Sequence, residues 1–173
     1  MNKAVFLDRD GVLNVAPIIG GVPSSPSKID DLQIIDGVKR AVRILKLNGF
    51  IPIVVTNQPD IARGKVEIET VSRINKDLCQ NLEIEHLYMC PHDNSDMCKC
   101  RKPEPGLIMK ASADLHINLN ESFMVGDRWK DIAAGQAAGC RCFFIDYSYN
   151  EDQPLQPFTK VNSLYEATLF ICN

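Results

Sequence analysis

The chain of 173 residues lacks a long apolar stretch and a strong excess of either charge. No segment approaches the roughly 20 apolar residues that a bilayer-spanning helix requires. The apolar run after Met1 covers only residues 4–7, which is too short for a signal-peptide core. The 19 basic and 22 acidic side chains give a formal net charge of −3, which argues against broad binding to nucleic acid or an anionic membrane. We therefore expect a cytoplasmic protein with a small partner that is bound locally.

Internal repeats and low-complexity segments are also absent. The content of 45% hydrophobic and 24% charged residues is ordinary for a globular protein. A chain of this length buries roughly two-thirds of its unfolded surface, so a core forms without disulfides. We expect a single domain over residues 1–173 and a monomer.

Cysteine is the residue in unusual supply, because the chain has seven, an odd number. An odd count without a secretory signal favours reduced thiols over disulfides. Four of them lie on the faces of predicted helices or strands, and we expect these to be core residues: Cys79, Cys140, Cys142 and Cys172.

The other three cysteines form a cluster with a histidine. Cys90-x-His92 is followed, after five residues, by Cys98-x-Cys100. Four such ligands within eleven residues are typical of one tetrahedral zinc with closed coordination, which is a structural site. We expect a zinc-binding loop over residues 90–105, which stiffens the chain just before two basic residues.

Apolar runs that alternate with helical periodicity indicate the fold class. A segment rich in glycine and proline, residues 14–35, is expected to be a loop. Strands are predicted at 4–7, 51–55, 84–89, 122–125 and 141–145, and helices at 37–48, 67–81, 106–115, 131–138 and 163–171. This alternation predicts an α/β, Rossmann-like domain with a mostly parallel sheet and helices on both faces. The connections leave no room for a large cap domain.

Polar clusters follow four of the predicted strands, where the ligand site of a parallel sheet lies. Asp8 and Asp10 come directly after the first strand, and Asp127 follows the fourth. One carboxylate can attack an electrophile while its neighbour holds or passes a proton, provided that a cation lets them lie together. Three carboxylates suit magnesium, which prefers oxygen ligands, and they indicate a phosphorylated substrate.

Hydrogen-bond donors and positive charge are expected at the same edge of the sheet. Thr56 and Asn57 end the second strand, and Arg101 and Lys102 follow the cysteine cluster. Each alone is typical of a strand end or a solvated surface. Their joint placement next to the three carboxylates is what indicates phosphoryl transfer, which needs donors and cations around the transferring group.

Four segments follow one another along the chain: DxDGV at 8–12, TN at 56–57, Lys102, and GDxxxD at 126–131. In this order and element context they resemble the four motifs of the haloacid dehalogenase-like phosphatases over nearly the whole chain. More narrowly, the D-glycero-D-manno-heptose 1,7-bisphosphate 7-phosphatases are similar in FLDRDG at 6–11, VTNQ at 55–58, IARG at 61–64, CPH at 90–92 and CKCRKP at 98–103. The histidinol-phosphate phosphatases share most of these segments.

The resemblance implies a mechanism for this chain. Asp8 attacks phosphorus and forms a phosphoaspartyl intermediate, while Asp10 protonates the leaving alkoxide and later activates water. Magnesium is bound by the Asp8 carboxylate, the Asp10 backbone carbonyl and Asp127. Asp131 is expected to orient the first turn of its helix or a metal-bound water.

The resemblance also implies which residues contact the substrate. Thr56 and Lys102 hold the phosphoryl oxygens, and further contacts come from Asn57, Gln58, Arg101 and Arg128. The loop at 15–27 is expected to act as a lid over an uncapped site.

Three functions remain open from the sequence. The first is a magnesium-dependent phosphatase acting on a small phosphorylated sugar, a heptose bisphosphate; the segment 60–64 favours it. The second is hydrolysis of histidinol phosphate, which the five-residue gap between the zinc-ligand pairs favours. The third is a phospho-acceptor signalling module, and Asp10 argues against it because an acceptor has no need for a general acid.

Overall fold

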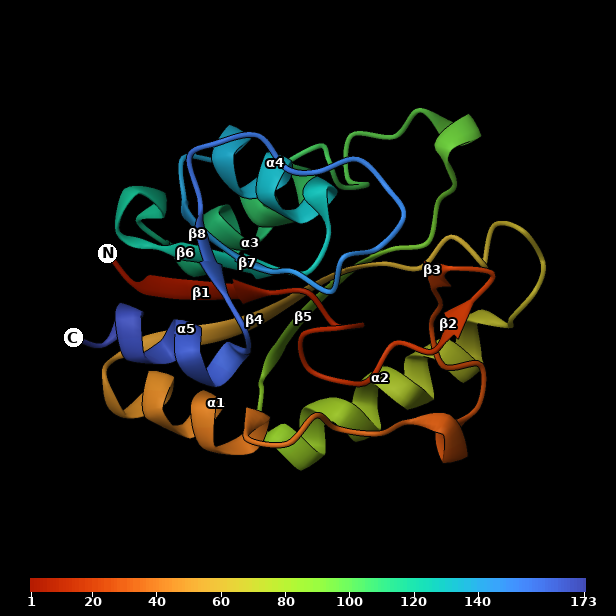
Figure 1. The fold of residues 1–173 in the computed structure, drawn as a ribbon, viewed down its shortest axis with the longest axis horizontal. Helices are drawn as coiled ribbons and strands as arrows, with labels where there is room; N and C mark the ends of the chain where they lie inside the picture. The colour runs from red at the N-terminus through yellow and green to blue at the C-terminus, as the bar shows by residue number, and fades with distance from the viewer.

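A six-stranded sheet, parallel throughout, is the centre of the computed structural model, which describes residues 1–173 (Figure 1). Parallel neighbours need crossover connections, and helices supply most of them. The strands are β1 (Lys3–Leu7), β4 (Phe50–Asn57), β5 (His86–Cys90), β6 (Phe123–Gly126), β7 (Arg141–Ile145) and β8 (Thr159–Val161). Their order across the sheet is β5-β4-β1-β6-β7-β8. The α/β prediction is confirmed.

Helices cover both faces of this sheet. The helices are α1 (Val38–Leu47), α2 (Ile68–Leu82), α3 (Gly106–Leu115), α4 (Trp129–Ala137) and α5 (Leu164–Ile171). In Figure 1, α1, α2 and α5 lie on one side of the strands, and α3 and α4 lie on the other. Two separate apolar clusters result, and alternate residues of β1 enter one or the other. Val5 and Leu7 pack into the first cluster, whereas Ala4 and Phe6 pack into the second.

The predicted helices and the five predicted strands all exist, and their ends agree with the structure within two residues. The largest difference in a strand start is at β5, which begins at His86 and not at residue 84. Ile84 is buried but lies before the strand. A buried apolar residue just before a strand has the same sequence signature as a strand residue, and this explains the error.

The sheet has one strand more than the sequence predicted. β8 is a three-residue edge strand of which only Val161 is buried. Such a short segment carries almost no alternation of polar and apolar residues, so its strand character depends on pairing with β7.

Residues 14–35 contain more structure than the predicted loop. A two-stranded antiparallel hairpin joins β2 (Ile18–Ile19) to β3 (Val22–Pro23) through Gly20 and Gly21. Both glycines have positive φ, +62° and +80°, and a Gly-Gly pair between apolar residues is a typical signal of a two-residue hairpin turn. Short 3-10 helices are found here and elsewhere: η1 (Ile29–Asp31), η2 (Asn94–Asp96) and η3 (Leu119–Glu121).

The four cysteines assigned to the core lie in two environments. Cys140 and Cys142 are buried, while Cys79 and Cys172 are partly buried and pack against the edge of the first cluster. No disulfide joins any pair of the seven cysteines.

The connection between β1 and β4 contains only the hairpin, η1 and α1, so the structure has no large cap domain. None of the helices has both the length and the apolar character that crossing a bilayer would need. Because β5, β4, β1 and β6 are consecutive neighbours, the loops after these four strands meet at one edge of the sheet.

The packing of α4 on the sheet depends on Gly135, where an added Cβ would lie 2.6 Å from the Met124 Cβ and 2.7 Å from the Cys142 Sγ. We predict that Gly135→Ala lowers the free energy of unfolding by about 1–3 kcal/mol through overpacking. This can be measured by urea denaturation. The reverse change at the exposed Ala137 is the control and should cost no more than about 1 kcal/mol. A more stable Gly135→Ala protein would contradict the prediction, because alanine is otherwise the better helix former.

Candidate active site

Lys102 is the cation in direct contact with the buried carboxylates Asp8 and Asp131. Its Nζ donates to Asp8 Oδ1 at 2.8 Å and to the backbone oxygen of Val55 at 2.8 Å, and it lies 2.6 Å from Asp131 Oδ1. All three charged side chains are buried. Burial lowers the pKa of a lysine, but the two carboxylates outweigh this, so the pKa of Lys102 is raised and the ammonium is retained.

Three buried carboxylates surround this lysine. Oxygens of Asp8, Asp127 and Asp131 all lie within 4.8 Å of one another. Burial and the charge of Asp131 raise the pKa of Asp8 to about 7, and burial and the charge of Asp8 raise the pKa of Asp127 well above its usual value. Asp127 Oδ1 has no hydrogen-bond partner. One ammonium does not balance three carboxylates, so this donor set fits a divalent cation that prefers oxygen ligands.

Two glycines allow the loops after β1 and β6 to approach these carboxylates. Gly11 has φ +87°, and a Cβ there would lie 2.0 Å from Asp127 Oδ2. A Cβ at Gly126 would lie 2.1 Å from the Cβ of Asp131. Any side chain at either position would displace a carboxylate, so both positions require glycine.

Asp131 also has the orienting role expected of it. Its Oδ2 accepts a hydrogen bond from the backbone N–H of Arg128 at 2.9 Å, which caps the first turn of α4. The same side chain contacts Lys102 through its other oxygen. The helix start and the buried charges are therefore fixed together.

The Asp10 carboxylate lies apart from the group of three and is held by a separate set of donors. Arg9 donates from Nε at 3.1 Å and from Nη2 at 3.0 Å. Three further side chains donate to it, Asn14 at 2.9 Å, Ser25 at 2.8 Å and Gln58 at 3.0 Å. Burial raises the pKa of Asp10, but the charge and hydrogen bonds of Arg9 outweigh burial, and the pKa lies below its usual value.

Arg9, Asn14 and Ser25 were not among the sequence-predicted site residues. Arg9 is fully buried, and its Nη1 donates to Asn75 Oδ1 at 2.7 Å. An arginine between two aspartates has a polar sequence signature, which gives no indication of burial. Ser25 lies directly after the hairpin and ties it to Asp10, a contact that depends on the tertiary fold.

The donors predicted at the end of β4, Thr56 and Asn57, lie in the site at different depths. Asn57 Nδ2 donates to the Lys102 carbonyl at 3.0 Å and its Oδ1 accepts from the Lys102 N–H at 3.1 Å, which joins β4 to the cysteine loop. Thr56 is buried, and its Oγ1 accepts from Gln58 Nε2 at 2.9 Å. Gln58 is also buried, and neither Thr56 nor Gln58 lines the cavity. The contacts of Gln58 are to Asp10 and Thr56, and the substrate contact that the resemblance implies for Gln58 stays a prediction.

A cavity of about 420 Å³ opens above Asp8 and Asp10. The hairpin residues Ile19 and Val22 line one part of it. Six basic side chains line its wall, Arg63, Lys65, Arg101, Lys102, Arg128 and Lys130, together with four carboxylates, Asp8, Asp10, Asp60 and Asp131. Three of the four predicted substrate-contact residues, Asn57, Arg101 and Arg128, therefore line the same cavity as the two aspartates.

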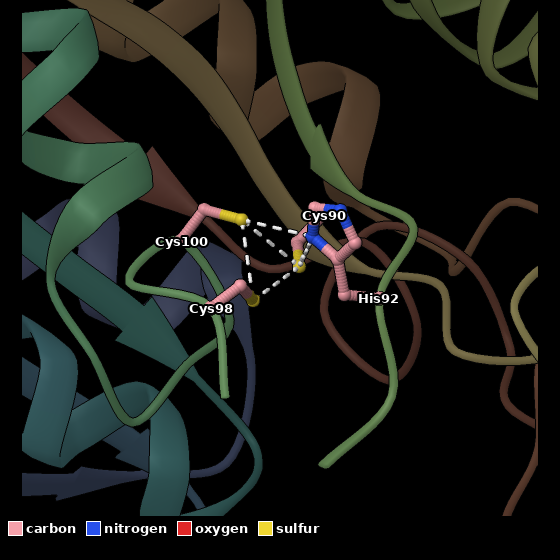
Figure 2. A group of neighbouring side chains, drawn as sticks. All are labelled: Cys90, His92, Cys98 and Cys100. Atoms are coloured by element: carbon pink, nitrogen blue, oxygen red, sulfur yellow. Dashed lines mark hydrogen bonds between the residues drawn. The ribbon is translucent and has the colours of Figure 1, made fainter. Parts of the chain in front are cut away.

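The Cys/His cluster lies on the loop after β5 (Figure 2). His92 Nδ1 lies 3.5 Å from Cys90 Sγ and 3.3 Å from Cys100 Sγ. The three sulfur atoms lie 3.3–3.6 Å apart. These distances are slightly shorter than the edge of about 3.8 Å expected for tetrahedral zinc–sulfur coordination. Burial raises the pKa of the Cys90 thiol to about 12, whereas at Cys98 hydrogen bonds outweigh burial and lower the pKa to about 7, so a cation is needed to hold Cys90 as a thiolate.

Three residues after β7 are further site residues that the sequence did not suggest. Tyr149 donates its hydroxyl to Asp127 Oδ2 at 2.9 Å, and Tyr147 donates to the Gly11 carbonyl at 3.0 Å. Glu151 forms an ion pair with Arg128. The segment between β7 and β8 is long and irregular in sequence, so no pattern placed it over the site.

The parallel sheet, the aspartate pair after the central strand β1, and the lysine and aspartates from neighbouring loops together define a haloacid dehalogenase-like hydrolase. The HAD-hydrolase-like family matches residues 99–167 of the chain. The D-glycero-beta-D-manno-heptose-1,7-bisphosphate 7-phosphatase of Pasteurella multocida (strain Pm70) is 38% identical over 149 residues, 80% of this chain and 78% of that protein. The enzyme of the same name from Escherichia coli (strain K12) is 41% identical over 147 residues, 78% of this chain and 74% of that protein.

Solved structures show the same fold. D,D-heptose 1,7-bisphosphate phosphatase from B. bronchiseptica, complexed with magnesium and phosphate, has a TM-score of 0.85 at 24% identity, and the match covers 98% of this chain and 97% of that one. The enzyme of that name from Burkholderia thailandensis has a TM-score of 0.68 at 21% identity over 98% and 97% of the two chains. The chain belongs to the D-glycero-beta-D-manno-heptose-1,7-bisphosphate 7-phosphatase family of HAD-like hydrolases, and it is a phosphatase.

The buried charges predict a large effect of removing Lys102. We expect Lys102→Met to lower the free energy of unfolding by about 3–5 kcal/mol in metal-free buffer, because it leaves the carboxylates uncompensated. Urea denaturation followed by circular dichroism measures this. The matched control is Lys65→Met at an exposed ion pair with Asp60, which should change stability by less than about 1 kcal/mol. Equal effects of the two changes would disprove the structural role of Lys102.

Proposed function

We propose that the chain hydrolyses the C7 phosphomonoester of a heptose 1,7-bisphosphate in a magnesium-dependent reaction. Support comes from the relatives that are named for this activity, whose sequences match more than three-quarters of the chain. The observation that carries the chemistry is the position of Asp8 and Asp10 together at the floor of a cavity lined by cations. A nucleophile, a proton donor and positive charge then face the same bound phosphate.

Asp8 is the proposed nucleophile. A carboxylate oxygen of Asp8 forms a bond to phosphorus, and the bond from phosphorus to the sugar oxygen breaks, which leaves a phosphoaspartyl group. Lys102 contacts the Asp8 carboxylate and is proposed to stabilise the negative charge of the phosphoryl oxygens. Thr56 is proposed to act with Lys102 on these oxygens, and Asn57 fixes the backbone of Lys102.

Asp10 is proposed to transfer the protons. It gives a proton to the leaving alkoxide, and the resulting carboxylate then takes a proton from the water that attacks the phosphoaspartyl group, which releases phosphate. In the free protein the hydrogen bonds of Asp10 hold its pKa low, which suits the second step. A bound phosphate adds negative charge beside Asp10, and negative charge raises a carboxyl pKa, so the first step becomes possible with substrate in place.

Magnesium is proposed to bind the Asp8 carboxylate, the Asp10 backbone carbonyl and Asp127. When bound, this cation neutralises the carboxylates and the charge on the transferring phosphoryl group. The unpartnered Asp127 Oδ1 supports the assignment, because a buried oxygen without a donor is costly unless a cation contacts it. Asp131 lies close enough to contribute a further oxygen or to orient a water.

The charge of the cavity favours a bisphosphate over histidinol phosphate. The lining has six basic side chains against four carboxylates, and Lys130 is the basic residue among them without an ion-pair partner. A second phosphate group is attracted by this charge, whereas the ammonium group of histidinol is repelled by it.

Arg101 and Arg128 are the proposed substrate contacts. The sugar is proposed to lie under the hairpin, with residues 15–27 as the lid.

The test is a phosphate-release assay that compares heptose 1,7-bisphosphate, histidinol phosphate and hexose monophosphates. We expect the highest kcat/KM with the heptose bisphosphate and no turnover when magnesium is removed. Asp10→Asn should lower kcat by about 10²–10⁴-fold, because proton transfer contributes by that amount. Asp114→Asn, a change on the surface of α3, is the control and should leave kcat unchanged.

Two results would contradict the proposed function. Preferential turnover of histidinol phosphate would assign the other substrate. A stable phosphorylated protein that releases no phosphate from any substrate, with Asp10→Asn indistinguishable from the wild type, would assign a phospho-acceptor module.

We also propose that Cys90, His92, Cys98 and Cys100 bind one structural zinc. The support is the approach of the four ligand atoms from one loop and the absence of any disulfide among them. The loop leads directly into Arg101 and Lys102, and Arg101 donates to Asn94 and to the His92 carbonyl of the same loop. Zinc would therefore fix the position of both cationic side chains.

Metal analysis should find about one zinc per chain, and Cys98→Ser should lose it together with thermal stability, because a hydroxyl is a poor zinc ligand. The matched control is Cys79→Ser, a thiol outside the cluster, which should retain the zinc. Inductively coupled plasma mass spectrometry and thermal unfolding measure the two effects. A Cys98→Ser protein with full zinc content and unchanged stability would disprove the assignment.

A single-domain monomer in the cytoplasm stays a prediction. Sedimentation velocity at the concentration of the activity assay measures the oligomeric state.

A further inference from the structure

Two tyrosines of the segment between β7 and β8 contact the site. Tyr147 donates to the Gly11 carbonyl in the loop after β1, and Tyr149 donates to Asp127 Oδ2 in the loop after β6. The two rings lie 5.5 Å apart between centroids, at an interplanar angle of 30°. This segment, residues 146–151, therefore contacts both loops that supply the carboxylates.

A second contact fixes the far end of residues 146–151. Glu151 accepts from Arg128 Nε at 3.1 Å and 3.0 Å, and Arg128 Nη2 also donates to it. Arg128 is the residue next to Asp127. The segment is thus attached on both sides of Tyr149, so the tyrosine hydroxyl is held in place before any ligand binds.

The two oxygens of Asp127 have different environments. Oδ2 accepts the hydrogen bond from Tyr149, while Oδ1 is buried and has no donor. A carboxylate that is fixed at one oxygen presents the other oxygen in a defined direction. The entropy cost of ordering this side chain is then met during folding and not when a cation binds. Without the tyrosine hydroxyl, both oxygens of a buried carboxylate would lack a donor.

We propose that Tyr149 is a positioning residue for Asp127, which holds the carboxylate so that Oδ1 is available to a divalent cation and thereby raises the affinity of the site for that cation. The proposal rests on the magnesium site of the proposed function. Hydrogen bonds to a ligating carboxylate typically contribute 10–100-fold to metal affinity. Tyr149 itself contacts neither the reacting carboxylate of Asp8 nor Asp10.

The experiment measures magnesium binding and not only turnover. Isothermal titration calorimetry with MgCl₂ is carried out on the full chain, dialysed free of magnesium and without substrate. Tyr149→Phe keeps the ring that packs on Tyr147 and removes only the hydroxyl. We expect its dissociation constant for Mg²⁺ to rise about 10-fold. Excess magnesium should restore kcat, with a higher half-saturating magnesium concentration.

The matched control is Tyr88→Phe. Tyr88 also donates its hydroxyl to a carboxylate, Asp114 Oδ2 at 3.0 Å, but on the protein surface away from the site. Its dissociation constant for Mg²⁺ should equal that of the wild type. Asp127→Asn should abolish the binding isotherm, which identifies the site that is measured.

The outcomes separate this proposal from the proposed function. If the wild type binds Mg²⁺ and Asp127→Asn does not, an unchanged dissociation constant in Tyr149→Phe overturns the positioning role alone. An equal rise in Tyr149→Phe and Tyr88→Phe overturns it as well. If the wild type binds no Mg²⁺, or Asp127→Asn binds it normally, the magnesium site fails and the role of Tyr149 fails with it.

Discussion

The crowding of three buried carboxylates around one lysine is the constraint on which the site depends. Asp8, Asp127 and Asp131 lie within reach of one ion, and Lys102 balances only part of their charge. Such an arrangement is unfavourable in an empty protein and favourable once a divalent cation and a phosphate bind, because both reduce the imbalance. The stability that packing supplies elsewhere in the fold must offset this local cost. The sheet and its two apolar clusters have that role.

The remaining parts of the site hold these charges from different directions. The cysteine loop carries Lys102, and Asn57 joins that loop to the end of β4 through two hydrogen bonds to the lysine backbone. The hairpin is tied to Asp10 through Ser25, and residues 146–151 contact Asp127 through Tyr149. Since no cap domain covers the cavity, these short segments are the elements that can distinguish one substrate from another.

The parts of the site that could be predicted are those with a local sequence signature. An apolar strand followed by a polar cluster places Asp8, Asn57 and Asp127 at one edge of a parallel sheet, because strand direction fixes that edge. Four zinc-type ligands within one loop can likewise be recognised without a structure. The contacts of Gln58 show the limit of such reasoning: its burial and its hydrogen bond to Asp10 have no local sequence signature.

The sequence by itself determined the fold class, the order of the elements and the residues that follow each strand, since periodicity and strand-end clusters are properties of short segments. Only the tertiary structure decided how the charges are held. Arg9 is buried, Tyr149 reaches Asp127 across 22 positions of the chain, and β8 is a strand only because β7 lies beside it. These contacts join segments with no common pattern, and they form because folding brings distant loops to the same edge of the sheet and excludes water there.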